Sequence, residues 1–440
     1  MDQGELVSRV FSAGVVGAGG AGFPTHVKLS SKGISFLVVN GAECEPLLNK
    51  DRHIMRNFSR VLVETVRVVV GSLGAKRAIF AVKGKHAEEV RALREAGGEV
   101  VELRDYYPAG DEVILVREVL GLAVPEGSIP ARVGVLVHNA ETILNVGRAL
   151  EGEPVLYKFV TVNGEVVEPG LWLVPIGVRA IDLVRACGGL RREDVVFVEG
   201  GPMTGSYRDS PDFSVSKTTA GLLVLPRDSL LAEMERRPLE WILKQARIAC
   251  VQCYQCTLVC SRRLVGYDLE PHRIMRAMAY GPQVSYAVLR GALLCSECNI
   301  CSSLHACPMG LSPRRVNQYL KRVLRERGVR FEGGGRDLAL DPMRDCRLLP
   351  TGRLKARLGL DRYPEDVPFR GVFDDFDRLE LSLRQGLGEP ASPVVEVGQA
   401  VEKGQVLASP PEGALGVPLH SPVSGVVEGV DGAKVVVRRA

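Results

Sequence analysis

Short apolar runs alternate with longer stretches of helical periodicity over the first 150 residues. The pattern predicts buried strands at 34–40, 77–83, 100–103 and 133–138, with helices at 52–73 and 86–96 between them. Strands that alternate with helices are typical of a layered α/β domain. We therefore expect one α/β domain over residues 1–150.

The pattern changes after residue 150, where short β-like runs predominate. Residues 157–170 predict a hairpin that turns at Asn163-Gly164, because this pair readily takes positive φ angles at both central positions. A strand at 171–174, a helix at 180–187 and a strand at 195–199 follow. Together they predict a small β-grasp unit within a domain at 151–227.

Three further regions follow from composition. Residues 228–330 are predicted to be helical between two cysteine-rich loops, and 331–387, with weak periodicity, to be a connector wrapped on other domains. Residues 388–440 hold short β runs that resemble the two halves of a biotinyl or lipoyl domain. Such carriers attach their group to a lysine between the halves, and no lysine lies between Lys403 and Lys434. We therefore expect a structural or docking role for this region.

Composition excludes several functions. The chain has 440 residues, 46% of them hydrophobic and 25% charged, with a net charge of +4, which is typical of a globular protein and gives no basis for nucleic-acid binding. The arginine-rich stretch 314–327 is interpreted as a solvated helix face. No run approaches the ~18 apolar residues of a membrane span, so any membrane link must run through a partner. Residues 1–10 do not resemble a secretory leader, and we expect a cytoplasmic protein.

Eight cysteines carry the strongest chemical signal. They form two groups, Cys250-x2-Cys253-x2-Cys256-x3-Cys260 and Cys295-x2-Cys298-x2-Cys301-x5-Cys307. Three thiolates spaced by two residues wrap one [4Fe-4S] cube, and the displaced fourth cysteine ligates the other cube. The spacing thus predicts one cluster on Cys250, Cys253, Cys256 and Cys307, and a second on Cys295, Cys298, Cys301 and Cys260.

The alternatives to two clusters are zinc and disulfides. Structural zinc sites use two cysteine pairs with a longer spacer, and disulfides are rare in a reducing compartment. Two departures from the usual cluster pattern are Ser261, where a proline often follows the first group, and the x5 spacing before Cys307. Both concern the loops and leave the ligand type unchanged.

A glycine-rich segment, Gly17-Ala-Gly-Gly-Ala-Gly-Phe-Pro-Thr25, carries the second signal. Glycines let backbone amides approach a phosphate, although a glycine run alone is weak evidence. Together with Asn40-Gly-Ala-Glu-Cys-Glu-Pro46, Tyr107-Pro-Ala-Gly110 and Asn139-Ala-Glu-Thr142, it resembles the flavin-binding 51 kDa subunit of respiratory complex I and its relatives, the RnfC subunits and the PduS-type cobalamin reductases. The resemblance covers most of residues 10–205.

The resemblance implies a multidomain α/β protein with a Rossmann-like FMN-binding domain, a β-grasp (SLBB) domain, a helical two-cluster ferredoxin domain and a C-terminal barrel-sandwich hybrid. It also implies roles for single residues. The implied FMN contacts are Gly17, Gly19 and Gly20 along the flavin, Lys28 near its phosphate or ribityl oxygens, Asn40 and Glu43 by the ring or ribityl chain, and Asn139 and Thr142 at the phosphate. Tyr107 and Gly110 would shape the nicotinamide side, and Glu45 would orient the nicotinamide carboxamide or ribose.

Simpler interpretations of these residues are turns, helix caps and polar core positions. If Glu43 and Glu45 flank the flavin as carboxylates, they should disfavour its anionic reduced form and lower its potential. Cys44, Cys187 and Cys346 receive no role.

The order of the domains favours one branch of the family. RnfC subunits carry the sandwich before the flavin domain, whereas here it follows the clusters, as in PduS-type reductases. The resemblance thus implies an NADH-dependent oxidoreductase in which FMN and two [4Fe-4S] clusters deliver electrons to a corrinoid, the substrate of an adenosyltransferase.

The alternatives are an RnfC-like subunit that exchanges electrons with ferredoxin in a larger complex, a soluble reductase for another acceptor, and an electron wire that no longer binds NADH. The sequence leaves open whether the chain forms a homo-oligomer and whether a bacterial microcompartment encloses it.

Overall fold

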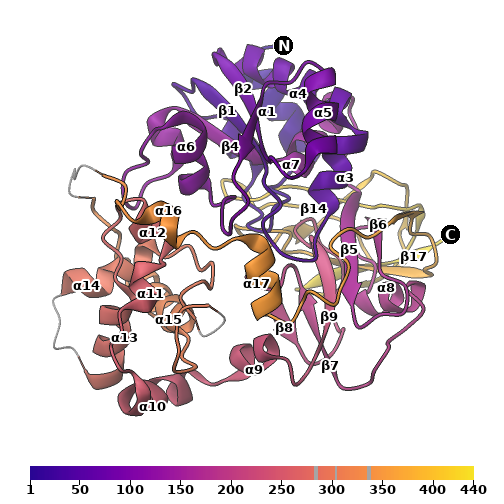
Figure 1. The fold of residues 1–440 in the computed structure, drawn as a ribbon. Coiled ribbons are helices and arrows are strands. Elements are labelled where there is room, and N and C mark those ends of the chain that lie inside the picture. Colours follow the sequence, from indigo (N-terminus) through magenta and orange to yellow (C-terminus); the bar gives the residue numbers. More distant parts are fainter. Residues whose placement is uncertain (282–285, 303–304, 334–337) are drawn as a thin grey trace.

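The chain folds into a first domain, a helical region that bears the cysteines, and two β-rich parts. In the computed structural model, residues 1–281, 286–302, 305–333 and 338–440 are described. The remaining segments fall within the predicted cluster domain and connector and contain no predicted site residue. Figure 1 shows the first domain at the top, the helical region on the left and the β-rich parts on the right. Within the described ranges, no helix is long and apolar enough to cross a membrane.

The first domain is a four-stranded parallel sheet with helices around it, as predicted. Its strand order is β3-β2-β1-β4, and β1 pairs in parallel with both β2 and β4. The strands are β1 (Phe36–Gly41), β2 (Arg77–Lys83), β3 (Val100–Leu103) and β4 (Val135–Asn139). The helices are α1 (Gln3–Ser12), α2 (Thr25–Leu29), α3 (Lys50–Asn57), α4 (Ser59–Leu73), α5 (Ala87–Glu95), α6 (Glu112–Leu120), η1 (Pro130–Val133) and α7 (Ala140–Leu150).

The single helix predicted at 52–73 is wrong, because two helices occupy this stretch. α3 and α4 meet at Phe58, whose backbone angles (φ −120°, ψ 20°) are not helical. The Phe58 ring packs against His53 and Phe159. Apolar residues keep helical spacing across the break, so the pattern could not reveal it. The break frees α3 to begin at Lys50, inside the first domain's polar interior.

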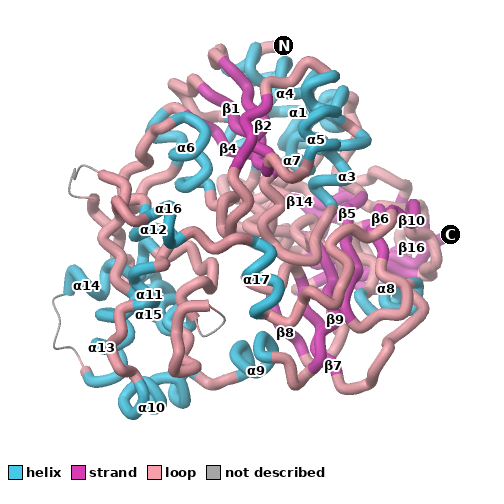
Figure 2. Tube along the Cα trace, viewed as in Figure 1, coloured by secondary structure: helices cyan, strands magenta, loops and turns pink. Residues whose placement is uncertain are grey.

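The second sheet has six strands in the order β10-β6-β5-β9-β7-β8. They are β5 (Tyr157–Gly164), β6 (Gly170–Pro175), β7 (Val195–Glu199), β8 (Ser206–Arg208), β9 (Gly221–Pro226) and β10 (Phe369–Val372), with α8 (Ala180–Ala186) packed beside them. Figure 2 shows these strands grouped in magenta on the right of the molecule.

The hairpin turn predicted at Asn163-Gly164 is wrong. Both residues lie inside β5, where they pair with Leu223 and Val224 of β9, and the chain turns after them, at 165–169. A Cβ atom at Gly164 would collide with the carbonyl of Val224, so glycine is required here by close strand contact. The side chain of Asn163 donates to the Pro364 carbonyl at 2.9 Å.

The cysteine region is helical between its loops, as predicted. Its helices are α9 (Leu230–Arg236), α10 (Leu239–Ala249), α11 (Gln255–Leu258), α12 (Ser261–Leu264), α13 (Pro271–Tyr280), α14 (Tyr286–Arg290), η2 (Gly291–Leu294) and α15 (Pro313–Glu326). The residues after it form α16 (Arg344–Arg347) and α17 (Thr351–Arg357) and then reach the second sheet through β10, which pairs in parallel with β6.

The last part consists of two small sheets, in the orders β11-β17-β16-β13 and β12-β14-β15. Their strands are β11 (Arg378–Ser382), β12 (Ser392–Pro393), β13 (Ala400–Val401), β14 (Val406–Ser409), β15 (Leu419–His420), β16 (Gly425–Val430) and β17 (Lys434–Arg439). β11 lies ahead of the boundary expected at residue 388, yet it pairs with β17. The sandwich therefore includes residues that weak periodicity had placed in the connector.

Two contacts tie the sandwich to the first domain. The backbone N–H of Leu387 donates to the Gly22 carbonyl at 3.0 Å. The buried Lys217 ammonium donates to the carbonyls of Gly14 (2.7 Å) and Pro418 (2.9 Å), so one side chain joins three parts of the fold. Burial lowers the pKa of Lys217 to about 7.

Candidate functional site

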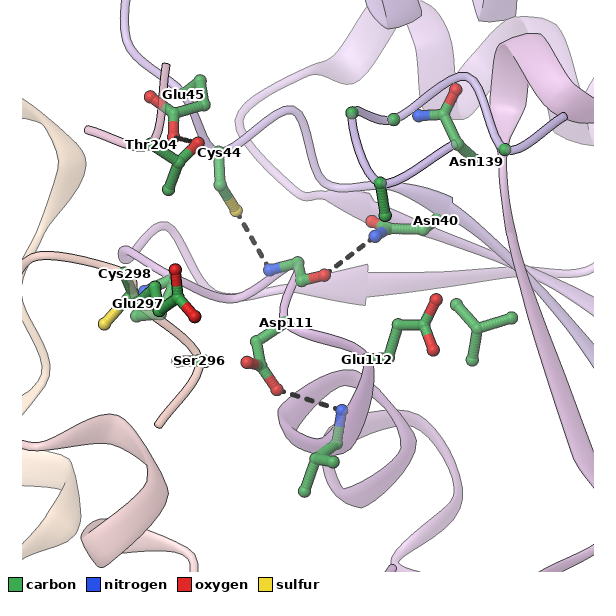
Figure 3. Close-up of a pocket in the computed structure, with 18 of the residues that line it drawn as sticks. Asn40, Cys44, Glu45, Asp111, Glu112, Asn139, Thr204, Ser296, Glu297 and Cys298 are labelled. Atoms are coloured by element: carbon green, nitrogen blue, oxygen red, sulfur yellow. Dashed lines mark hydrogen bonds between the residues drawn. The ribbon is translucent and has the colours of Figure 1, made fainter. Parts of the chain in front are cut away.

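A cavity of ≈ 1100 Å³ lies where the first domain meets the second sheet and the cysteine region. Every residue that the sequence predicted for the flavin and nicotinamide lines it. Figure 3 shows Asn40 and Asn139 on one side of this space and Glu297 and Cys298 on the other. The structure thus brings the predicted residues together, while their contacts with a cofactor stay a prediction.

The glycine loop forms one wall of the cavity. Its ends are joined by a hydrogen bond from Gly17 N–H to the Phe23 carbonyl (2.9 Å), and Ala18 N–H ties the loop to α7 by donating to the Thr142 hydroxyl (2.9 Å). A Cβ atom at Gly19 would lie 3.4 Å from that of Asn139. Gly20 has a φ of +113° and open space where a side chain would stand. The loop therefore lets a ligand approach its backbone closely.

Unpartnered polar atoms cluster beside this loop. The Thr25 hydroxyl and the Nε2 atom of His138 are buried without a hydrogen-bond partner. Burial, with a smaller contribution from the charge of Lys28, lowers the pKa of His138 to about 3, so its ring is neutral. Lys28 Nζ lies 2.9 Å from a Glu112 oxygen and donates to the Val137 carbonyl. Buried polar groups normally have partners, so this wall fits a polar ligand such as the phosphate end of FMN.

Asn40, Gly110 and Cys44 form one hydrogen-bonded unit. The Asn40 amide donates to the Gly110 carbonyl at 2.9 Å, and Gly110 N–H donates to the Cys44 sulfur at 3.0 Å (Figure 3). A Cβ atom at Gly110 would lie within 3.4 Å of both partners. Burial raises the pKa of the Cys44 thiol, which stays protonated. Cys44 is thus an acceptor that fixes the cavity wall, a role the sequence did not indicate.

The two carboxyl groups of the Asn40–Pro46 motif have separate tasks. Glu43 accepts the backbone N–H groups of Asp51 (2.6 Å) and Arg52 (3.0 Å) at the start of α3. Burial, helped by the charge of Asp51, raises the pKa of Glu43 to about 8. Glu45 accepts from Met203 N–H at 2.9 Å and from the Thr204 hydroxyl at 2.6 Å, and burial raises its pKa. The expected lowering of the flavin potential by Glu43 therefore applies only above about pH 8.

A buried charge network lies under the cavity, and the sequence analysis missed it. Lys50 Nζ lies 2.7 Å from Asp51 and 3.1 Å from Glu141, while Lys158 of β5 donates to the same Glu141 carboxylate and to the Ala18 carbonyl. The Asn139 amide donates to Asp51 at 2.6 Å. A lysine inside the apolar run of β5 was the available signal, because such charges are buried only when paired.

The second cysteine group reaches the cavity. Cys295 and Cys298 line it together with Ser296 and Glu297. The hydroxyl of Tyr107 donates to the Cys298 carbonyl at 2.8 Å. Tyr107 therefore connects the predicted nicotinamide side directly to a cysteine loop.

Cys250, Cys253, Cys256 and Cys307 line a separate, smaller pocket together. Burial, with smaller contributions from the nearby Cys298 and Cys295, raises the pKa of the Cys260 thiol to about 12. The thiols thus gather in the two groups that the crossed assignment requires, while the ligation itself stays a prediction. Among the described residues, no three potential ligands lie close enough together to hold a single metal ion.

The stretch 314–327 is more than a solvated face. Its first residue, Arg314, is buried, pairs with Glu235 at 2.5 Å and lines the cavity with an unpartnered Nε atom. Lys321 also lines the cavity and holds Glu297 at 2.8 Å. The helix α15 therefore places two ion-paired cations in the wall of the cavity.

Comparison with known families assigns the regions of the chain. Residues 10–148 match the Nuo51 FMN-binding domain, and 159–206 the SLBB domain. Residues 249–312 match the 4Fe-4S dicluster domain, and 373–439 the RnfC barrel sandwich hybrid domain. The predicted fold class is confirmed, and the sandwich match begins ahead of β11.

Similar proteins were found over the whole chain. The chain is 41% identical to the cobalamin reductase PduS of Citrobacter freundii, over 100% of this chain and 97% of that protein. It is 40% identical to PduS of Salmonella typhimurium, over 99% and 96%. It is also 32% identical to one component of the Na(+)-translocating ferredoxin:NAD(+) oxidoreductase complex of Acetobacterium woodii, over 62% of this chain and 61% of that protein.

Proposed function

This chain belongs to the family of the cobalamin reductase PduS, and from that premise we propose that it uses NADH, FMN and two [4Fe-4S] clusters to reduce a corrinoid. One observation carries the proposal: the cavity lined by the predicted flavin residues is also lined by Cys295 and Cys298. FMN supplies the conversion of a two-electron hydride into single electrons, which the clusters require.

The chain's own residues would position the flavin and the nicotinamide. Thr25 and His138, whose buried Oγ1 and Nε2 atoms have no hydrogen-bond partner, would join the predicted Asn139 and Thr142 at the phosphate end, and Gly20 leaves open space beside them. Asn40 would hold the ring side, and Tyr107 and Gly110 would shape the nicotinamide side. Glu45, fixed by hydrogen bonds from Met203 and Thr204, would orient the nicotinamide.

The geometry supports an order for the two clusters. The cluster proposed on Cys295, Cys298, Cys301 and Cys260, called here the near cluster, borders the cavity and would receive electrons first. The cluster proposed on Cys250, Cys253, Cys256 and Cys307, called the outer cluster, would follow.

A second candidate is an RnfC-like electron-transfer subunit. The 32% identity to the component of the Acetobacterium woodii complex favours it. In that case the chain would exchange electrons with ferredoxin inside a larger assembly. We propose the corrinoid reductase first because PduS matches over the whole length, and we place it in the cytoplasm, free or in a microcompartment.

The acceptor is tested by anaerobic NADH oxidation with cob(II)alamin and with ferredoxin side by side. We expect NADH to bleach the flavin band and cob(II)alamin to be consumed. Bleaching with reduction of ferredoxin alone would favour the second candidate. A fully flavinated protein whose spectrum NADH leaves unchanged would refute both.

The cluster assignment is tested with Cys260→Ser. The variant should perturb the paramagnetic resonance signal of the near cluster and leave the outer cluster intact. Cys256→Ser is the matched variant, and it should do the reverse. Damage to the outer cluster in Cys260→Ser would show that the ligands are not crossed.

A further inference from the structure

Exposed apolar side chains surround the outer cysteine loop. Val251, Tyr254 and Met309 line the same small pocket as Cys253, and Ile248 precedes them at the end of α10. The exposed fractions of Val251, Tyr254, Met309 and Ile248 are 64%, 39%, 41% and 73%. Single exposed apolar residues are ordinary, but a contiguous group marks an interaction surface. We call these four residues, together with Cys253, the exit face.

The surroundings of the exit face are positively charged. Arg276 donates to the Gln252 side chain at 3.1 Å. Arg247, which precedes Ile248 in α10, donates its Nε–H to the Ala279 carbonyl. Neither arginine has an ion pair among the described residues. Glu270, which accepts from the Tyr254 hydroxyl at 3.1 Å, is compensated by Arg273 at 2.8 Å. The exit face therefore has an apolar centre surrounded by cationic side chains.

We propose that the exit face docks a protein that carries the corrinoid and presents an acidic contact surface. The inference rests on the proposed function, because it takes the outer cluster as the last carrier. In this docking, one electron would pass from the outer cluster to the cobalt of the corrinoid and lower its oxidation state by one, and no bond of this chain would form or break. Electron transfer weakens steeply with distance, so the acceptor must approach Cys253, which is exposed.

The charge pattern favours a protein over the free corrinoid. Transient electron-transfer interfaces are small, and opposite charges speed and orient the encounter. Cobalamin itself carries amide groups and no cluster of acids, so Arg247 and Arg276 would contribute little to its binding. Acidic residues around the contact surface of a carrier protein would form ion pairs with both arginines.

The test compares two electron acceptors of the full-length chain that carries its flavin and clusters. The probes are a corrinoid adenosyltransferase loaded with cob(II)alamin, and free cob(II)alamin. In Arg247→Glu/Arg276→Glu at low ionic strength, we expect at least a tenfold slower reduction with the loaded transferase. With free cob(II)alamin we expect less than a twofold change. Val251→Asp should act in the same way, and added salt should slow only the wild type with the loaded transferase.

Arg60→Glu/Arg91→Glu, on the first domain, is the control with equal charge. Equal losses with both probes would overturn the proposal by making the face a site for the corrinoid itself, and no loss with either would overturn it as well. If the wild type reduces corrinoid in neither form although NADH bleaches its flavin, the proposed function has failed instead.

A second inference concerns the sulfur atoms of the near cluster. The Ser261 hydroxyl lies 3.7 Å from the Cys298 sulfur, and the Asn317 amide donates to the Cys295 sulfur at 3.7 Å. Both side chains are buried. A cluster-bound thiolate has no proton, so the hydroxyl must be the donor. Among the described residues, no side chain donates to the sulfurs of the outer group.

The place of Ser261 explains the departure noted in the sequence. It is the first residue of α12, directly after Cys260. Proline is favoured at this helical position because its missing N–H is not needed there. Serine can replace it without harm to the helix and adds a donor that proline lacks.

We infer that Ser261 and Asn317 are positioning residues that raise the reduction potential of the near cluster. Hydrogen bonds to sulfur draw charge from the cluster and stabilise its reduced form. This inference also rests on the proposed cluster assignment, but it is independent of the acceptor.

A redox titration followed by paramagnetic resonance tests this inference. Ser261→Ala, Ser261→Pro and Asn317→Leu should each shift the midpoint potential of the near cluster to more negative values, with the outer cluster unchanged. Ser261→Thr keeps the hydroxyl and should restore the wild-type value. Ser312→Ala is the control, since Ser312 bonds the hydroxyl of Ser302 at 3.2 Å.

Iron content establishes that both clusters are present in every variant. Equal shifts in both clusters, or no shift in both Ser261→Ala and Ser261→Pro, would overturn the inference.

Discussion

The charge network under the cavity offers a test of how the first domain and the second sheet are held together. Glu141 on α7 is the only carboxylate in contact with the Lys158 ammonium among the described residues, and it also contacts Lys50. All three side chains are at most 2% exposed. The change Glu141→Gln keeps the shape and the acceptor for the Phe159 N–H but removes the charge.

The expected cost is large because an ammonium is left buried. Removing one partner of a buried ion pair costs about 3–5 kcal/mol. Lys50 keeps its ion pair with Asp51, so the cost falls mainly on Lys158. Burial already lowers the pKa of Lys158 to about 8, although the charge of Glu141 acts to raise it. Without Glu141 the pKa of Lys158 falls further, and the folded variant holds a neutral amine.

This neutral amine gives the defect a defined pH dependence. The unfolded chain protonates Lys158 up to about pH 10.4, so below pH 8 the unfolded variant binds one proton more than the folded variant. Its stability therefore rises with pH relative to the wild type, by up to about 1.4 kcal/mol per pH unit. The deficit should be greatest near pH 5, shrink up to about pH 8 and then level off.

The assay is equilibrium unfolding in urea, followed by the fluorescence of Trp172. This residue lies on β6, which pairs with the strand of Lys158. The chain has two tryptophans, so a Trp241→Phe background leaves one probe. The double variant Glu141→Gln/Lys158→Met removes both charges and should recover most of the loss.

Two outcomes would refute the reasoning. One is a Glu141→Gln variant within about 0.5 kcal/mol of the wild type at pH 7, the range of ordinary surface changes. The other is a double variant less stable than Glu141→Gln, which would show that Lys158 is stabilising without its partner.

Two further predictions concern the cavity wall. Gly22→Ala should destabilise the protein by more than about 1 kcal/mol and lower its flavin content, because φ is +64° and the added Cβ would lie 2.5 Å from Gly386. Gly33→Ala, with φ +69° and open space, is the control, and equal effects of both variants on flavin content would contradict this explanation. Because the pKa of Glu43 is raised to about 8, the flavin spectrum should change with a midpoint near pH 8 as this carboxyl ionises. The stability due to its protonated form should be lost as the pH rises from about 4.5, the ordinary pKa of the carboxyl, to about 8. Glu43→Gln should abolish this spectral step, and a step of unchanged size in the variant would assign it to another group.

Features encoded by local spacing could be predicted from the sequence. The cysteine groups and the glycine loop need only a few neighbouring residues each, and the strands of the first sheet are continuous apolar runs. Every predicted flavin residue therefore reached the cavity wall. Cys307 lines one pocket with Cys250, Cys253 and Cys256, as the spacing predicts, while the ligation stays a prediction.

Features that depend on partners distant in the chain could not be predicted. Tyr107 was expected beside the nicotinamide, but only the folded chain shows its bond to the Cys298 carbonyl. Gly164 looked like a turn glycine, yet it is required by the approach of β9. β10 and β11 have weak hydrophobic patterns because each is held by pairing with a strand from elsewhere in the chain, β6 and β17 respectively.

The bond between Leu387 and Gly22 has a consequence for how the protein is made. The glycine loop leaves the ribosome early, but the residue that braces it follows only after the whole cysteine region has been synthesised. We expect the nascent first domain to hold flavin poorly until the sandwich has folded against it. Flavin would then bind only after the sandwich has been translated. A chain truncated before the sandwich would lack the colour of the flavin and would not be reduced by NADH.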